Sequence, residues 1–414
     1  MNEKHRFLKG FLAGFGAMLL LVIAGVSAVI FFNIQSITTW LRNASAVSTE
    51  NAESVTSDSV ISKADRIMSI IDANFLNEAD EEQMIEGMYK GLVDGLEDPY
   101  SVYFDAEEYQ SMMESTNGIY GGIGVTVSQD PETGIITLVK PFEGSPGMEA
   151  GILPGDILYK VNGEEVTGED LSEVVAKIKG EEGTKVLLTI VREGEADYID
   201  VEVVRRQIEV PTIASKMLEN NIGYIQIVEF DEVTPDQFKE ALSSLEKQGM
   251  KGLVVDLRDN PGGLLSAVNE ILDQFLAKGL IVYTEDKNGK REEYLSDEEH
   301  QFNKPLAVLV NGNSASASEI FSGAIKDYGI GTLIGTTTFG KGIVQTVVDL
   351  GDGTAMKLTI SKYYTPKGNN IHGIGIEPDI ALELDDAVRQ KAVITEEEDN
   401  QLQKALEVLN EKIK

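Results

Sequence analysis

The chain has 414 residues, with 35 Lys and Arg against 69 Asp and Glu, and its formal net charge is −34. The length leaves room for two or three domains, and the negative charge disfavours nucleic acid as a partner, because phosphate binding needs a basic surface. The absence of cysteine excludes disulfides, thiolate nucleophiles and cysteine-based metal sites. Only three histidines are present, so catalysis would depend on Ser, Lys, Asp, Glu or Tyr.

The first predicted element is a membrane-spanning helix. Residues 10–32 contain no charged side chain, and about 20 apolar residues suffice to cross a bilayer as a helix. Basic residues precede this segment and acidic residues follow it, so the positive-inside rule places the N-terminus in the cytoplasm and exports the rest. A cleaved signal peptide is the alternative, with residues 44–46 as the cleavage site. The polar segment that follows, rich in Ser, Thr and Ala, is expected to be a flexible tether.

Two amphipathic helices are predicted after the tether. Apolar residues recur at three- and four-residue steps from Ile61 to Phe75 and again from Ile85 to Leu96. The sequence Asp98-Pro99 is expected to close the second helix, because a residue before proline avoids the helical conformation.

Between residues 118 and 206 the pattern changes to short strands separated by glycine-rich turns. Strands are predicted at 121–127, 135–140 and 186–192, and a short helix at 170–180. The segments GIGV (122–125) and GDILYKVNG (155–163) resemble a PDZ domain of the type found in bacterial proteases. This resemblance implies that the C-terminus of a polypeptide binds at the loop formed by four residues: Gly122, Ile123, Gly124 and Val125.

From Pro211 onward, strands alternate with helices, which predicts an α/β core. Buried strands are expected at 221–230, 253–259 and 306–311. A last amphipathic helix carries an apolar stripe along residues 402–413. Such a stripe must pack either on the chain's own body or on a second subunit, and we expect a homodimer.

One serine and one lysine are candidates for catalysis. Ser316 begins a predicted helix, and Ser316-Ala-Ser-Glu319 fits a capping box; the same geometry places an oxyanion beside free amides. Lys341 lies among small and apolar residues, and burial would lower its pKa so that the neutral amine could accept the serine proton. Gln345, four residues on, falls on the same side as Lys341. A nucleotide-binding P-loop is disfavoured because Gly342 replaces the required Ser or Thr.

The chain from about residue 61 to its end resembles the C-terminal processing peptidases, which combine a Ser–Lys dyad with a PDZ domain. The motifs occur in order: LEDPYSVYF (96–104), GGIGV (121–125), GDILYKVNG, DLRDNPGG (256–263), VLVNGNSASASEIF (308–321), TTFGKGIVQ (337–345), KLTISKYYTPKG (357–368) and GIEPDI (375–380). The resemblance implies that the nucleophile is Ser316, the base Lys341, the residue that orients the base Gln345 and the supporting acid Glu319. It also implies that the oxyanion is bound by the backbone amides of Gly262 and Ala317. No cofactor and no metal are implied.

We therefore expect a multidomain, membrane-anchored, extracytoplasmic serine endopeptidase that recognises substrate C-termini. A catalytically silent PDZ scaffold that binds protein C-termini is the alternative. The expected parts are a cytoplasmic tip with a transmembrane anchor (1–33), a tether (34–60), a helical region (61–116), a PDZ domain (117–207), an α/β protease core (208–385) and a C-terminal helical region (386–414).

Overall fold

The computed structural model describes residues 57–297, 302–389, 391 and 394–414. The chain divides into two compact units, residues 1–84 and 85–414. The predicted membrane-spanning segment and the alternative cleavage site lie outside the described residues. Among the helices that the structure does describe, none is long and apolar enough to cross a membrane.

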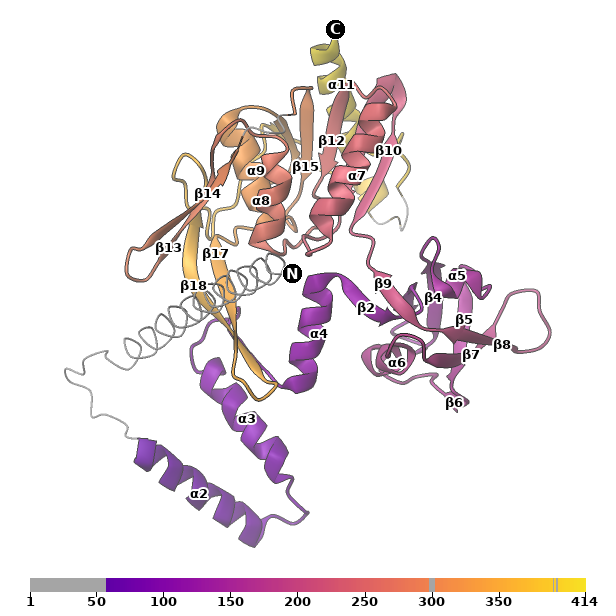
Figure 1. Ribbon diagram of the computed structural model, residues 1–414, viewed down its shortest axis with the longest axis vertical. Coiled ribbons are helices and arrows are strands. Elements are labelled where there is room, and N and C mark those ends of the chain that lie inside the picture. The colour runs from indigo at the N-terminus through magenta and orange to yellow at the C-terminus, as the bar shows by residue number, and fades with distance from the viewer. Residues whose placement is uncertain (1–56, 298–301, 390, 392–393) are drawn as a thin grey trace, which may run out of the picture. The chain divides into compact units, whose positions relative to one another are not determined.

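Both predicted N-terminal helices are present, as α2 (Ser57–Asn74) and α3 (Glu81–Asp94) (Figure 1). The second helix ends earlier than predicted, because Gly95 follows Asp94 and glycine is a poor helix former. Leu96 already belongs to a turn, in which its amide donates to the Val93 carbonyl oxygen (3.0 Å). None of the residues of α2 is buried, and Ala64, Met68 and Ile71 of its apolar stripe are half-buried.

The PDZ domain is built on an antiparallel sheet with the strand order β3-β4-β5-β7-β8, in which β6 pairs with β5. Its core consists of the inward-facing aliphatic side chains of these strands together with Val174 and Ile178 of α6. Its elements are β3 (Val125–Gln129), β4 (Ile136–Pro141), α5 (Pro146–Glu149), β5 (Asp156–Val161), β6 (Glu164–Glu165), α6 (Leu171–Ile178), β7 (Lys185–Val191) and β8 (Ile199–Val204).

A two-stranded ribbon joins the PDZ domain to the rest of the chain. Its strands, β2 (Ile119–Gly122) and β9 (Arg206–Glu209), are antiparallel, and next to them the Val210 amide donates to the Gly118 carbonyl oxygen (2.8 Å). The single strand predicted for 121–127 is wrong. It is divided into β2 and β3, because Gly124 has φ 67° and interrupts the extended backbone.

The α/β core contains a six-stranded sheet of order β10-β11-β12-β15-β16-β19, parallel except for β10. The predicted buried strands are confirmed as β11, β12 and β15, and runs of β-branched and other aliphatic residues are typical of parallel strands covered on both faces. The strands are β10 (Ile213–Met217), β11 (Ile222–Ile227), β12 (Gly252–Asp256), β15 (Leu306–Val310), β16 (Thr332–Gly335) and β19 (Ile380–Ala381).

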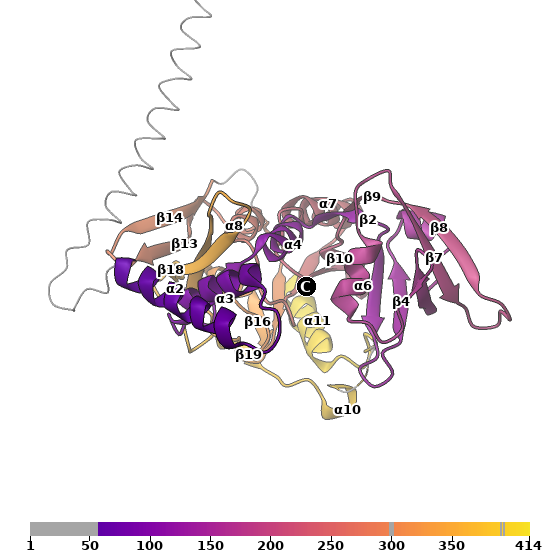
Figure 2. The same ribbon diagram turned by 90° about the horizontal axis from the view of Figure 1, so that it is seen from below.

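Helices cover both faces of this sheet (Figures 1 and 2). Two consecutive residues of β12 face opposite sides of the sheet: Val255 packs in the cluster that includes α7, α8 and α9, whereas Val254 packs in the cluster that includes α11. These helices are α7 (Thr234–Lys247), α8 (Leu265–Asp273), α9 (Ala317–Tyr328) and α11 (Asn400–Ile413).

The apolar stripe of the last helix is covered by the chain's own sheet. Leu402, Ala405 and Leu409 are buried against Val254 and its neighbours on that face. The stripe therefore gives no reason to expect a second subunit, and the argument for a homodimer that rested on it is wrong. An amphipathic pattern shows that a helix has a partner but does not say which one.

A second sheet flanks the core, with the order β1-β18-β13-β14 and with β17 paired to β18. It brings the segment after α3 alongside the C-terminal half of the chain, since β1 pairs with β18. The elements not yet given are β1 (Val102–Phe104), α4 (Ala106–Asn117), the short helix η1 (Glu219–Asn221), β13 (Gly279–Asp286), β14 (Arg291–Ser296), β17 (Ile343–Asp349), β18 (Ala355–Tyr364) and α10 (Asp386–Arg389).

Candidate active site

Three loops of the core meet because they follow three neighbouring parallel strands. Residues 257–264 follow β12, residues 311–316 follow β15, and residues 336–342 follow β16. The carboxyl ends of parallel strands lie at one edge of the sheet, which is where α/β proteins bind ligands. Segments far apart in the sequence that contain Gly262, Ser316 and Lys341 thus lie at one edge.

Ser316 has a strained backbone between β15 and α9. Its φ and ψ are 52° and −112°, a region that costs a non-glycine residue about 1–3 kcal/mol and that clusters at active sites. In α/β-hydrolases, a sharp, strained strand-to-helix turn of this kind exposes the hydroxyl of the nucleophilic serine. The hydroxyl of the fully buried Tyr363 donates to the Ser316 carbonyl oxygen (3.1 Å) and helps to hold this conformation.

Glu319 ties the serine loop to the lysine loop. Its carboxylate is fully buried; Oε2 accepts from the amides of Ser316 (3.0 Å) and Lys341 (2.8 Å). Oε1 accepts from the Thr338 hydroxyl (2.6 Å) and the Gly340 amide (2.8 Å). One carboxylate thereby fixes the backbone of both candidate catalytic residues.

We expect Glu319→Gln to loosen this connection. A glutamine side chain has one acceptor oxygen, so two of the four donors must face its NH₂ group, and hydrogen bonds to a charged group contribute about 1.5–3 kcal/mol each. The expected result is a loss of about 2–3 kcal/mol in the free energy of unfolding, together with a lower kcat at an unchanged KM. Urea unfolding and steady-state kinetics measure these quantities. An unchanged kcat in a folded variant would contradict the role given to Glu319.

Glu319 holds the backbones of Ser316 and Lys341 together, and the Lys341 ammonium group lies over the Tyr100 ring. Within the described residues no hydrogen bond or ion pair joins Nζ to Ser316 or to Gln345. The Gln345 side-chain amide donates to Thr359 Oγ1 instead (3.3 Å). Burial lowers the pKa of Lys341 and the ammonium of Lys357 lowers it further, while nearby carboxylates act in the opposite direction. A lowered pKa is the property that a lysine base needs.

The two expected oxyanion donors differ in their present hydrogen bonds. Within the described residues the Ala317 amide has no acceptor, whereas the Gly262 amide donates to Oδ1 of the buried Asn260 (2.8 Å). Gly262 has φ 111°, and a Cβ there would lie 2.7 Å from Ser316 Cβ. Glycine at this position keeps the space beside the serine open.

The PDZ loop has the features of a carboxylate site. In the described part of the chain, the Ile123 and Gly124 amides have no acceptor, while their carbonyl oxygens accept from Gly147 and Phe142 (2.8 Å each). Val125 begins β3, which among the residues that the structure describes pairs only with β4, so that its other edge is unpaired there. An extended peptide could add to this edge with its carboxylate on the free amides.

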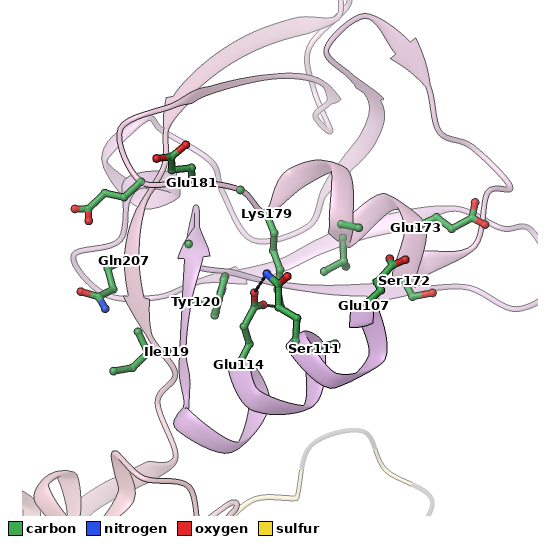
Figure 3. Close-up of a pocket in the computed structure, with 16 residues that line it drawn as sticks. Glu107, Ser111, Glu114, Ile119, Tyr120, Ser172, Glu173, Lys179, Glu181 and Gln207 are labelled. Atoms are coloured by element: carbon green, nitrogen blue, oxygen red, sulfur yellow. Dashed lines mark hydrogen bonds and ion pairs between the residues drawn. The ribbon is translucent and has the colours of Figure 1, made fainter. Parts of the chain in front are cut away.

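A pocket of about 890 Å³ adjoins this domain, away from Ser316 and Lys341. Figure 3 shows Glu114 of α4 and Lys179, the residue after α6, directed toward each other across it, with Nζ 3.0 Å from the carboxylate. Nζ also lies 4.8 Å from the centroid of the Tyr120 ring. Burial raises the pKa of Tyr120 to about 12, so its hydroxyl stays neutral under this lysine.

Sequence reasoning assigned no role to three side chains of the site. These are Asn260, Tyr363 and Tyr100, whose ring lies under the Lys341 ammonium. All three occur in motifs that resemble the family, so a signal for them existed, but only the fold shows what they contact. His372 is exposed, and its backbone packs against Gly342.

Comparisons with known proteins agree with this layout. Residues 221–382 match Peptidase family S41, residues 137–192 match a PDZ domain, and residues 22–108 match the activating protease CtpB N-terminal domain. The carboxy-terminal processing protease CtpA of Bacillus subtilis (strain 168) is 41% identical over 332 residues, 80% of this chain and 71% of that protein. CtpB of the same organism is 38% identical over 333 residues, 80% and 69% of the two chains.

A solved structure shows the same fold. It is that of a putative S41 protease from Bacteroides fragilis, with a TM-score of 0.50 and 17% identity over 88% of this chain and 99% of the other. The helical N-terminal region, the PDZ domain and the α/β core together define a serine peptidase. The chain belongs to the carboxy-terminal processing proteases of peptidase family S41. Membership implies that the PDZ domain binds substrate C-termini.

Proposed function

We propose that this peptidase cleaves exported or membrane polypeptides with a Ser316–Lys341 dyad, and that Gln345 orients the lysine. The observation that carries the proposal is the buried Glu319 carboxylate, which accepts from the amides of both Ser316 and Lys341. It gives the two residues a common support. The lowered pKa of Lys341 adds a base that is neutral at lower pH than an exposed lysine would be.

The proposed reaction is acyl transfer. Ser316 Oγ attacks the peptide carbonyl carbon while the neutral amine of Lys341 accepts the hydroxyl proton. The C–N bond then breaks, the ammonium returns the proton to the leaving amine, and an acyl-enzyme remains. Lys341 next accepts a proton from water as the water oxygen attacks the ester carbonyl, and the ammonium then returns this proton to Ser316 Oγ as the C–O bond breaks and the acid is released.

The negative charge on the carbonyl oxygen would be stabilised by backbone amides. The Ala317 amide has no acceptor in the described residues and lies at the N-terminus of α9, where the helix dipole favours an anion. The Gly262 amide becomes available only when it leaves Asn260 Oδ1. The proposed oxyanion hole is thus half formed in this conformation.

We also propose that the protein is anchored in the cell membrane with its catalytic domain outside the cytoplasm. Support comes from the uncharged stretch 10–32 and from the charges that flank it. The net charge of −34 would then belong to an exported, well-solvated surface.

The function is tested with an unfolded substrate that ends in apolar residues and carries either a free C-terminal carboxylate or an amide. Because hydrogen bonds to a charged group contribute about 1.5–3 kcal/mol, the amide should be cleaved with a kcat/KM at least about tenfold lower. Equal cleavage of both substrates would contradict capture of the tail. An inert wild-type enzyme that still binds the tail would favour the scaffold alternative.

A matched pair of glycine variants locates the tail site in the same assay. Gly124→Ala and Gly144→Ala both place a side chain at similar φ, 67° and 69°, but only at Gly124 would the new Cβ clash, 2.6 Å from Ser145 Cβ. Gly124→Ala should therefore raise KM for the free-tailed substrate about tenfold, while Gly144→Ala should leave it near the wild-type value.

A further inference from the structure

Tyr100 is held rigidly beside the candidate base. It follows Pro99 in a turn where its amide donates to Asp98 Oδ1 (3.2 Å) and the Ser101 hydroxyl donates to Asp98 Oδ2 (2.6 Å). The Thr359 amide of β18 donates to Ser101 Oγ (3.1 Å), which fastens the turn to the sheet. The next residues form β1, paired with β18. The ring is thus positioned by the core and by the turn that contains it.

The ring lies under the Lys341 ammonium, with Nζ 4.7 Å from its centroid. This separation is within the roughly 6 Å over which an aromatic face attracts a cation. In the described part of the chain, Nζ has no hydrogen bond and no ion pair. Its contact with the Tyr100 ring is therefore a direct attraction on the ammonium that no hydrogen bond or ion pair in the described residues replaces.

Charged groups surround this lysine on several sides. Lys357 of β18 disfavours the ammonium, while Asp98 of the turn and Glu319 of α9 favour it. His372 lies near Asp98, on the loop that packs against Gly342. Burial of the amine also disfavours the charged form. The aromatic face attracts the ammonium and so favours the charged form of Lys341, whereas burial and Lys357 disfavour it.

The attraction depends on the charge of the lysine. The electron-rich face of an aromatic ring binds a cation but has little affinity for a neutral amine. A neutral amine would gain more by accepting the Ser316 hydroxyl proton and by donating to the Gln345 side-chain oxygen. Protonation and position of the lysine are thereby linked: the charged form rests on the ring and the neutral form is free to turn to the serine.

We propose that Tyr100 is a positioning residue that holds protonated Lys341 on its ring, where it does not hydrogen-bond Ser316, and releases the lysine when it is neutral. This proposal rests on the proposed function, in which Lys341 is the base. Tyr100 itself neither gives nor takes a proton in this scheme and acts only through Lys341. Its effect is on the pH at which the base becomes available.

The test is the pH profile of kcat/KM for wild type and for Tyr100→Phe, Tyr100→Trp and Tyr100→Leu. The acid limb is the pH range in which kcat/KM rises as Lys341 loses its proton. If the ring stabilises the ammonium, this limb should lie at the highest pH with Trp and at about the same pH with Tyr and Phe. With Leu it should lie about half to one pH unit below its wild-type position. If the ring only excludes water, the order reverses, because a smaller side chain admits water and raises the lysine pKa.

A second measurement is independent of turnover. In a Ser316→Ala background, NMR titration of ¹³C-labelled lysine gives the pKa of Lys341 for each Tyr100 variant, and the same order is expected. The reversed order, or a common pKa in all variants, would overturn the proposal. Tyr100→Phe and Tyr100→Trp keep a ring at this position, so the pKa of Lys341 can be compared between them and wild type even if Tyr100→Leu fails to fold.

Failure of the two proposals can be told apart. Lys341→Met should be inactive at every pH, and an active Lys341→Met enzyme would remove the dyad and with it the role of Tyr100. An inactive Lys341→Met enzyme, combined with Tyr100 variants that share the wild-type acid limb, would refute the role of Tyr100 alone.

Discussion

Ser316→Ala and Lys341→Met should each lower kcat/KM by about 10⁴-fold or more, as the loss of a nucleophile or its base does in other serine peptidases. Alanine leaves no oxygen to form the acyl-enzyme, and methionine fills the lysine site without a group that accepts a proton. The two changes act on one step, so the double variant should be no slower than either single variant. Cleavage of a free-tailed, unfolded substrate measures these rates.

Lys357→Met is a matched control for the lysine variant. It removes a neighbouring ammonium that lowers the pKa of Lys341, so the pKa of Lys341 should rise. The neutral amine then appears at higher pH, the acid limb of kcat/KM moves upward in pH, and the plateau above it is retained.

Undiminished cleavage by either Ser316→Ala or Lys341→Met would refute the dyad.

Arg258→Ala should destabilise the core by about 3–5 kcal/mol, because it leaves two buried carboxylates without a counter-charge. The guanidinium is 2.6 Å from Asp256 and 2.7 Å from Asp399, and it also donates to Gln401 (3.0 Å). Asp399 caps α11 by accepting from the amides of Gln401 and Leu402. The arginine thus fastens the last helix to the end of β12.

Urea unfolding of Arg258→Ala, compared with Lys304→Ala, measures this effect. Lys304 pairs with Glu246 at 2.7 Å, but both side chains are partly exposed, and such pairs contribute about 0–1 kcal/mol. The arginine variant should unfold at clearly lower urea concentration, and the lysine variant near the wild-type midpoint. Similar midpoints for the two would mean that the buried pair does not fasten α11.

The elements of the core were predictable where hydrophobic patterning alone decides them. Continuous aliphatic runs predicted β11, β12 and β15, and the order of parallel strands then places the loops after them at one edge. Contacts between distant segments were not predictable in this way. The pairing of β1 with β18 places Tyr100 beside Lys341, and no local pattern in either segment encodes that contact. The motif containing Tyr100 was recognised, but without a role.

Two errors had local causes. The left-handed conformation of Gly124 divides the strand predicted for 121–127, since alternation of apolar residues does not register a change in φ. Helix α3 ends at Asp94, because Gly95 follows it, and not at the Asp98-Pro99 sequence that was predicted to end it. The apolar stripe of α11 was identified correctly, but its partner depends on which face of the sheet remained uncovered after α7, α8 and α9 had packed.

The ribbon of β2 and β9 has a bearing on how this architecture arose. The core reaches the PDZ domain at Gly118 and resumes at Val210, and these two residues are joined by a hydrogen bond of 2.8 Å. In the core's own chain path they are therefore neighbours, and a tight turn would close the gap. The PDZ domain is in this sense an inserted module, which an ancestral peptidase could have gained at a hairpin without altering the course of any core strand.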